Sequence, residues 1–137
     1  MKRIIIATIL AIFCVTISSA QKYQVLKASV SQAVNGRYIA DFKEQGNVYV
    51  QLYKGVLKYI SGGKVFRKFV ITKNCGTATH NGVRRTRYYA TETTKNIKVG
   101  IEIYKAVNAN KYELVIYYGT GKEDGDFAID CYMKRIN

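Results

Sequence analysis

The stretch that decides the fold is residues 97–118, which read IKVGIEIYKAVNANKYELVIYY. Apolar and polar residues alternate on both sides of the central Asn108-Ala109-Asn110, as they do in strands with one buried face. Asparagine tolerates the positive φ of a tight turn, so we expect the two halves to pair as an antiparallel hairpin. The apolar face of this hairpin would then hold Ile97, Val99, Ile101 and Ile103 beside Tyr112, Leu114, Ile116 and Tyr118.

The same rhythm continues on either side of this hairpin. Residues 48–53 alternate in the same way, and residues 57–60 and 65–72 flank Ser61-Gly62-Gly63, which is typical of a second tight hairpin. The chain contains no proline and 12 tyrosines, and aromatic and branched side chains suit a pleated, half-buried surface. A last strand is expected near the end of the sequence, with Phe127, Ile129, Cys131 and Met133 on its core face.

Residues 22–34 fit two patterns. Their apolar side chains follow helical spacing, and Asn35-Gly36 would end such a helix, but Leu26, Ala28, Val30 and Val34 also alternate as in a strand. We favour the strand, because everything after this segment reads as a meander. The predicted fold is mostly β: a single small antiparallel β-barrel or β-sandwich of about seven to nine short strands, with one N-terminal helix left open.

The first 20 residues have the composition of a secretion signal. Two basic residues precede an almost unbroken apolar run from Ile4 to Ile17, and Ser18-Ser19-Ala20 supplies small residues before a cleavage point. The run is shorter than the ~20 residues of a membrane-spanning helix, although an uncleaved anchor is the alternative. We expect residues 1–20 to be a cleaved signal peptide and residues 21–137 to be one basic all-β domain, exported to the periplasm, the cell surface or the medium.

Positive charge dominates the composition. The chain has 22 Lys and Arg residues against 9 Asp and Glu residues, a net charge of +13. Removal of the leader would leave 117 residues with 20 basic and 9 acidic side chains. A field of this sign attracts anionic partners such as nucleic acid, lipid phosphate or acidic glycan, and it also favours solubility. We expect no membrane-spanning segment once the leader is removed.

The three cysteines suggest a disulfide. Cys14 would leave with the leader, so Cys75 and Cys131 would remain as an even pair in a compartment where disulfides persist. A bridge between them would stabilise the fold by roughly 4 kcal/mol on the chain-entropy account. Two reduced thiols are the alternative if the protein is not exported.

Few side chains suit catalysis or metal binding. His80 is the single histidine and is expected to lie in a loop over residues 77–82, without a nucleophile or a carboxylate paired to it by spacing. One histidine and two distant cysteines do not make a zinc site. The acidic residues near Gly121–Asp126 resemble a calcium loop only superficially, because the twelve-residue pattern and its closing glutamate are missing. We predict no catalytic residue, metal or cofactor, which favours a non-enzymatic protein over an enzyme of an unrecognised kind.

The most suggestive feature is a basic stretch in the middle of the chain. No acidic residue occurs between Lys64 and Glu92. Arginine beside tyrosine can hold anions through forked hydrogen bonds and can stack on planar or sugar rings. The alternative is that the cations point into water and prevent edge-to-edge aggregation of the strands. The predicted anion-binding residues are Lys64, Lys68, Arg84, Arg85, Arg87 and Tyr89.

These observations predict an exported, non-enzymatic binding or envelope-associated domain. Its basic surface, rich in arginine and tyrosine, would bind an anionic polymer or a lipid headgroup: a glycan, a lipid phosphate or nucleic acid. Two alternatives remain open at this stage. One is a carrier barrel of lipocalin-like architecture with a tyrosine-lined cavity for a small ligand. The other is a secreted inhibitor or interaction module that uses an exposed loop such as residues 74–82.

Overall fold

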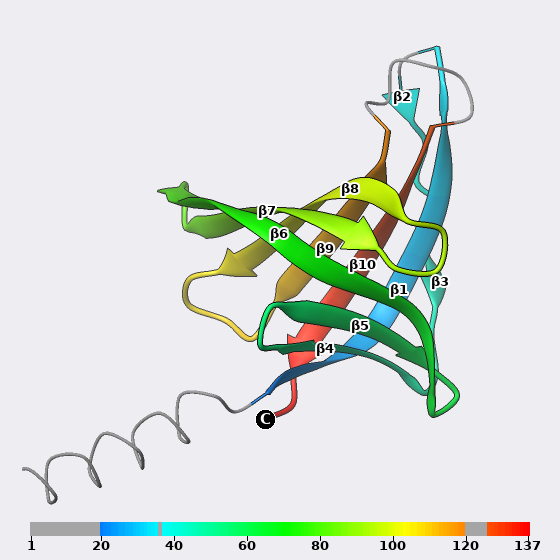
Figure 1. Cartoon of the computed structure of the whole chain (residues 1–137). Helices are drawn as coiled ribbons and strands as arrows, with labels where there is room; N and C mark the ends of the chain where they lie inside the picture. Colours follow the sequence, from blue (N-terminus) through cyan, green and yellow to red (C-terminus); the bar gives the residue numbers. More distant parts are fainter. Residues whose placement is uncertain (1–19, 36, 120–125) are drawn as a thin grey trace, which may run out of the picture.

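The computed structural model describes residues 20–35, 37–119 and 126–137 (Figure 1). Most of the predicted leader and of the acidic turn at residues 121–126 therefore lies outside the described residues, which form ten strands and no helix. The strands are β1 (Gln21–Val34), β2 (Arg37–Tyr38), β3 (Lys43–Glu44), β4 (Val48–Tyr53), β5 (Val56–Ser61), β6 (Lys64–His80), β7 (Val83–Glu92), β8 (Ile97–Ala106), β9 (Tyr112–Tyr118) and β10 (Phe127–Arg135).

Eight of these strands close into an antiparallel barrel. β4 to β10 form a meander in which each strand pairs with the next, and β1 closes the circle. One edge of β1 pairs with β10 over residues 23–32, and the other pairs with β4 over residues 21–24 and then with the short strands β3 and β2. The mostly-β prediction is confirmed, the barrel replaces the sandwich, and residues 22–34 belong to a strand.

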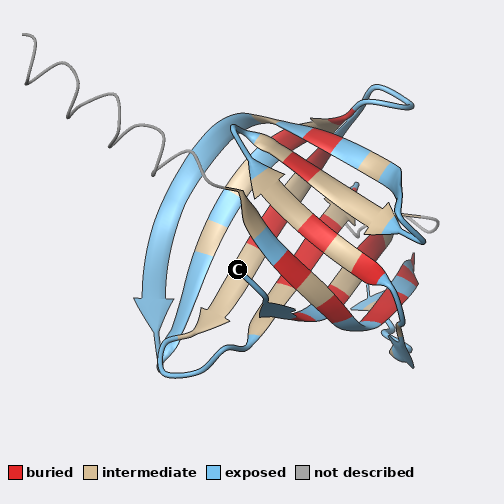
Figure 2. Ribbon diagram, turned by 90° about the horizontal axis from the view of Figure 1, so that it is seen from below, coloured by how far each residue is buried: buried red, intermediate tan, exposed pale blue. Residues whose placement is uncertain are grey.

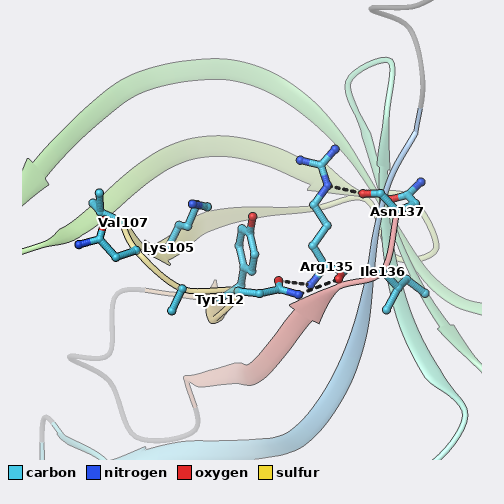
Figure 3. Close-up of a pocket in the computed structure, with 9 residues that line it drawn as sticks. Lys105, Val107, Tyr112, Arg135, Ile136 and Asn137 are labelled. Atoms are coloured by element: carbon cyan, nitrogen blue, oxygen red, sulfur yellow. Dashed lines mark hydrogen bonds between the residues drawn. The ribbon is translucent and has the colours of Figure 1, made fainter.

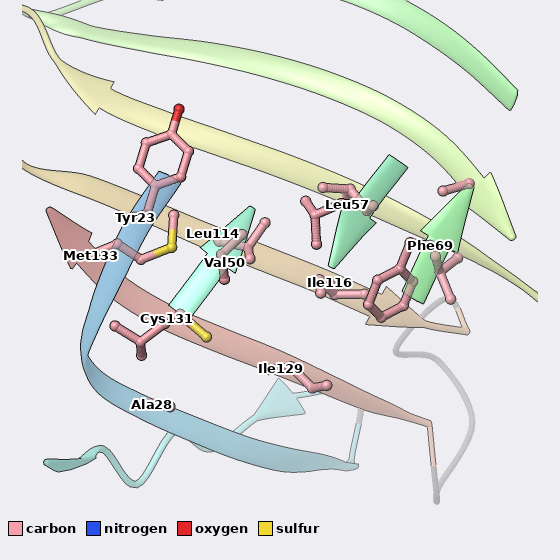
Figure 4. Packing of buried hydrophobic residues seen from close by; sticks show 14 of the residues in the cluster. Tyr23, Ala28, Val50, Leu57, Phe69, Leu114, Ile116, Ile129, Cys131 and Met133 are labelled. Carbon is pink, nitrogen blue, oxygen red and sulfur yellow. The ribbon is translucent and has the colours of Figure 1, made fainter. Parts of the chain in front are cut away.

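Alternating side chains fill the middle of the barrel. The predicted core faces are confirmed except at Ile97, which is exposed: Ile101, Leu114 and Ile116 have no exposed surface, and neither have Leu57 and Phe69 from the neighbouring hairpin. Figure 4 shows Leu57, Phe69, Leu114 and Ile116 converging from strands on opposite walls. In the view from below, buried positions alternate with intermediate or exposed ones along most barrel strands, whereas the outer part of β6 is exposed throughout (Figure 2). Period-two patterning therefore becomes one closed core, as expected for a small barrel whose interior is filled.

The hairpin β6–β7 is longer than the sequence predicted. We expected a loop over residues 77–82, but β6 continues through His80, and the turn is formed by Asn81 (φ 49°) and Gly82 (φ 74°) alone. Two successive residues with positive φ make the type of turn that matches the twist of paired strands. The prediction was wrong because threonine-rich residues 77–79 suit an exposed strand as well as a loop.

The outer half of β6 leaves the barrel wall. β5 pairs with β6 only as far as Val70, and the Gly55 carbonyl then accepts a hydrogen bond from the Ile71 N–H. Beyond this point β6 pairs with β7 alone, and each residue from Thr72 to His80 is exposed. Figure 1 shows this part of the hairpin extending past β4 and β5.

The predicted disulfide is wrong. Cys75 is exposed on the outer half of β6, whereas Cys131 is completely buried on the core face of β10, and both thiols are free. Burial is the main reason that the pKa of Cys131 rises to about 12, so this thiol stays protonated. The even cysteine count misled the prediction because it carries no information on which faces the two thiols occupy. None of the described segments forms a helix with the length and hydropathy needed to cross a bilayer.

Candidate functional site

One end of the barrel carries a basic pocket, which we call the mouth. It is formed where β1 begins and where β4, β8 and β10 end, beneath the outer part of the β6–β7 hairpin. Its volume is about 270 Å³. The cations Arg84, Lys105 and Arg135, the tyrosines Tyr23, Tyr88 and Tyr112, and Gln21, Leu52, Thr77, Thr86 and Ile103 line it.

The three cations reach the mouth because they continue the core-facing alternation of their strands. Lys105 follows Ile103 on β8, Arg135 follows Met133 on β10, and Arg84 precedes Thr86 and Tyr88 on β7. Side chains two residues apart point to the same side of a strand. A cation at an inward-facing position near a strand end therefore lies at the rim of the core and not on the outer wall.

Tyrosines form the floor of the mouth. The rings of Tyr23 and Tyr112 pack edge to face with centroids 4.9 Å apart, and the Tyr23 hydroxyl donates to Gln21 Oε1 at 2.9 Å. Burial and the neighbouring Tyr112 raise the pKa of Tyr23, while the charges of Arg135 and Arg84 act in the opposite direction. Both guanidinium groups are therefore close enough to influence this hydroxyl.

The backbone and side chain of Arg135 are held in place. The Asn110 side chain accepts a hydrogen bond from the Arg135 N–H at 2.8 Å and donates one to its carbonyl at 3.0 Å. The Arg135 Nε donates to the main-chain oxygen of Asn137 at 2.7 Å (Figure 3). Lys105 Nζ lies 5.9 Å from the centre of the Tyr112 ring. A shallower surface adjoins the mouth here, and Figure 3 shows Lys105, Tyr112 and Arg135 arranged around it.

No carboxylate side chain lines the mouth or this adjoining surface. The ion pairs found among the described residues both involve Glu102 on the outer wall, and neither involves Arg84, Lys105 or Arg135. Three positive charges therefore surround a concave polar pocket without a side-chain counter-ion. Such a pocket favours an anion, because low-dielectric walls concentrate the field of the surrounding charges.

The opposite end of the barrel, which we call the Arg67 end, contains a cation with its own partners. The Arg67 guanidinium donates to the Tyr118 hydroxyl at 3.2 Å and lies over the rings of Phe66 and Tyr118, 5.3 and 5.5 Å from their centres. Tyr118 in turn stacks on Phe127 with a centroid distance of 4.2 Å. The aromatic rings therefore cover this charge.

Glu92 is buried at the Arg67 end and is also satisfied. Its two carboxylate oxygens accept the N–H groups of Thr94 and Lys95 at 3.1 and 3.2 Å, which fixes the turn between β7 and β8. Burial acts to raise the pKa of Glu92, but the hydrogen bonds from Thr94 and Lys95 and the charge of Arg67 outweigh it and lower the pKa. Glu92 thus has its hydrogen-bond partners within the fold, whereas the Arg67 Nε is buried without one among the described residues.

The predicted anion-binding residues are split between three places. Arg84 lines the mouth, whereas Arg85 and Arg87 lie on the outer wall, 3.7 and 3.8 Å from the Glu102 carboxylate. Tyr89 is exposed and shares a shallow outer cleft with Arg87. Glu102 is a cross-strand neighbour from β8, so a scan for acids along β6 and β7 does not find it.

Lys64 and Lys68 lie neither at the mouth nor beside Arg85 and Arg87. Lys64 is exposed at the β5–β6 turn, and Lys68 is exposed opposite Lys58. The mouth also contains residues that the sequence analysis missed, namely Lys105, Arg135, Tyr23, Tyr88 and Tyr112. Their signal was present in the sequence as basic or tyrosine residues at core-facing positions near strand ends, but it requires knowing which ends meet.

A second polar cluster lies on the outer wall of β9 and β10. Glu113 and Asp130 lie side by side in a cleft with Tyr38, Tyr104 and Tyr117. Burial, followed by the hydrogen bond and negative charge of Glu113, raises the pKa of Asp130 to about 8. Burial and the neighbouring negative charge therefore both favour the protonated form of Asp130.

Neither a metal-ligand group nor a comparison with known proteins assigns a role to these clusters. Within the described residues no three histidine, cysteine or acidic side chains are grouped as metal ligands. His80 forms a hydrogen bond with the neighbouring Asn81 amide at 3.1 Å and lines an outer cleft with Arg85 and Tyr104. No protein-family model, curated protein or solved structure matches this chain. The mouth is therefore interpreted from its own chemistry.

Proposed function

We propose that this protein is a non-enzymatic binding domain that takes an anionic group into the mouth of its barrel. The observation that carries the proposal is the pocket between Arg84, Lys105 and Arg135, which no acidic side chain of the described residues lines. Arg135 donates its Nε–H to Asn137, and neither Arg84 nor Lys105 forms an ion pair within the described part of the chain. A planar guanidinium presents parallel donors that match a carboxylate, phosphate or sulfate, and the lysine adds a mobile point charge. The tyrosine floor offers flat apolar surface and hydroxyl groups to whatever carries the anion.

The size of the mouth fits one anionic group with a small part of its carrier. The middle of the barrel is filled by the core side chains, so a ligand enters at the rim rather than into the centre. This favours a domain that binds its ligand at the rim over a carrier with an internal cavity. A glycan, a lipid or a nucleic acid would place one charged unit in the pocket and the remainder on the adjoining surface formed by Asn110, Tyr112 and Ile136.

Export fits this proposal but is separate from it. The leader pattern in residues 1–20 would bring the domain to a compartment where anionic lipids and polysaccharides are abundant. The excess of 20 basic over 9 acidic side chains in residues 21–137 would draw such partners to the surface at long range. Recognition itself would depend on the mouth.

Two matched variants of adjacent arginines test the proposal. Arg84→Gln removes a cation from the mouth, and Arg85→Gln removes one from the outer wall, where Glu102 neutralises it. Binding of inorganic phosphate is followed by calorimetry at low ionic strength. We expect Arg84→Gln to weaken phosphate binding about tenfold, the value of one charge-assisted hydrogen bond. Arg85→Gln should change it less than about twofold, since net charge alone acts weakly at this distance.

The proposal is overturned if phosphate does not bind saturably at low salt. It is equally overturned if both variants weaken binding to the same extent, because the affinity would then follow net charge and not the mouth.

A further inference from the structure

The strand beside the mouth has a free edge. After Ile71 no described strand pairs with the outer edge of β6, although the strand continues for nine residues to His80. Unpaired N–H and C=O groups along such an edge are ready to pair with another extended chain. No side chain from Asn74 to Thr79 carries a charge, and all of them are small or of moderate size, so a second backbone could approach closely.

The register of the hairpin identifies the groups that point outward. His80 and Val83 flank the two-residue turn and are opposite each other. In an antiparallel pair, residues that exchange both hydrogen bonds alternate with residues whose N–H and C=O point away. Because the residues flanking such a turn exchange their bonds, the N–H and C=O groups of Thr77 and Thr79 point to the free edge.

Thr77 joins this edge to the mouth. Its side chain lines the mouth pocket and lies 3.0 Å from the Thr86 hydroxyl, oxygen to oxygen, while its backbone groups face outward. Two bulges, between Ile71 and Lys73 and between Asn74 and Gly76, interrupt the β6–β7 pairing on the barrel side of Thr77. A chain paired with Thr79 and Thr77 would therefore end beside a residue that lines the mouth together with Leu52 of β4.

We infer that the anionic ligand of the mouth is the C-terminal carboxylate of a peptide. The last residues of the peptide pair as a short strand with Thr77–Thr79 of β6, and its carboxylate enters between Arg84, Lys105 and Arg135. This inference rests on the proposed function and names the ligand class of that same site. Strand addition combined with capture of a terminal carboxylate explains why a free edge and a cationic pocket meet at one residue.

A second copy of this chain is a poorer occupant of the edge. Pairing β6 with β6 would bring two strongly basic molecules together with their mouths close to each other, and no acidic side chain of the described mouth would offset the repulsion. A peptide that ends in a carboxylate instead brings the charge that the pocket lacks. The attraction is long-ranged at low salt and weakens as salt screens it.

The test compares three ligands. Two are forms of an eight-residue peptide of alternating valine and threonine, one with a free C-terminal carboxylate and one with a C-terminal amide. The third is acetate, which probes the pocket alone. Binding to the full chain is measured by nuclear magnetic resonance titration. We expect the free acid to bind at least about tenfold more tightly than the amide, because a charged hydrogen-bonded group is lost, and more tightly than acetate.

Two variants of Thr79 separate the edge from the pocket. Thr79→Pro removes the outward N–H, at a position where proline breaks no bond to β7, and Thr79→Ala keeps the N–H as a matched control. Thr79→Pro should weaken peptide binding at least about fivefold, the value of one hydrogen bond, and leave acetate binding unchanged. Thr79→Ala should bind the peptide as the parent does.

The outcomes distinguish the peptide ligand inferred here from the more general proposal that the mouth binds an anion. If acetate and phosphate perturb the mouth but the peptide acid binds no better than acetate, the inference is overturned and the proposed function stands. The inference also fails if the amide matches the acid, if Thr79→Pro has no effect, or if sedimentation shows that β6 edges of two copies pair. If neither small anion perturbs the mouth, the proposed function itself is wrong.

Discussion

The two ends of the barrel use inward-facing cations in opposite ways. At the Arg67 end the guanidinium lies over the rings of Phe66 and Tyr118, donates to the Tyr118 hydroxyl and acts on the buried Glu92, so it interacts with groups of the fold itself. At the mouth Arg84, Lys105 and Arg135 surround a pocket without an acidic side chain. The same residue type therefore stabilises the structure at one end and remains available to a partner at the other.

The largest expected effect concerns stability at the Arg67 end. Arg67→Met keeps the apolar stem but removes the hydrogen bond to Tyr118 and the positive charge near Glu92. We expect it to lower the free energy of unfolding by about 2–3 kcal/mol, because the buried Tyr118 hydroxyl loses its hydrogen bond and the buried Glu92 loses a nearby positive charge. Urea denaturation measures this change.

Arg84→Met is the matched control at the mouth. It should change the free energy of unfolding by less than about 0.5 kcal/mol, the usual range for a surface substitution away from buried contacts. Equal destabilisation by the two variants would mean that both cations are structural, and the contrast between the ends would disappear.

The second prediction concerns binding at the mouth. The double variant Arg84→Gln/Lys105→Gln should weaken phosphate binding about 100-fold, since each lost charge-assisted contact contributes about tenfold. Its unfolding midpoint in urea should stay near that of the parent. Calorimetry at low salt measures the affinity. If the double variant binds phosphate as tightly as Arg84→Gln alone, Lys105 does not contact the anion.

Much of this contrast could be predicted from the sequence, but not all. Alternation over residues 48–53, 97–118 and 127–133 places the core faces correctly apart from the exposed Ile97, because a period of two follows from strand geometry alone. Period two cannot reveal which strand ends meet around a closed barrel. Arg84 was therefore predicted together with Arg85 and Arg87, although the structure places them on opposite sides of β7.

Partners from neighbouring strands were the other source of error. Glu102 forms ion pairs with both Arg85 and Arg87 across the β7–β8 pair, and it lies outside the acid-free stretch that suggested a basic surface. Cys75 and Cys131 were paired by number alone, yet one is on a free strand edge and the other is in the core. Both errors arise because side-chain partners are set by register and closure, which a linear pattern does not contain.

The third prediction separates the outer wall from both ends by its pH dependence. Asp130 holds its proton to about pH 8 in the folded protein, whereas an unfolded aspartate releases its proton near pH 4. The folded state therefore binds more protons between these values, and stability falls as the pH rises through that window.

Asp130→Asn removes this loss. Relative to the parent, the variant should gain about 1 kcal/mol of stability between pH 5 and pH 9, a value reduced by solvent screening of the partly exposed pair. Urea denaturation at the two pH values measures the gain. A constant difference between variant and parent across this range would show that Asp130 does not retain its proton.

The smallest expected effect is that of Cys75. Cys75→Ser should change the unfolding free energy by less than about 0.5 kcal/mol, because the thiol is exposed and forms no bridge. A thiol reagent should modify Cys75 in the folded protein and reach Cys131 only after unfolding. Failure to detect any free thiol in the native material would restore the disulfide and contradict the placement of both residues.

An anion site at the mouth requires that Arg84 and Arg135 contact the ligand. The Nε–H resonances of arginine side chains can be followed individually as phosphate is added at low salt. We expect those of Arg84 and Arg135 to shift saturably with a common affinity, while those of Arg67, Arg85 and Arg87 stay in place. Shifts of equal size at Arg85 and Arg87, or the absence of any shift at Arg84, would contradict an anion site at the mouth of the barrel.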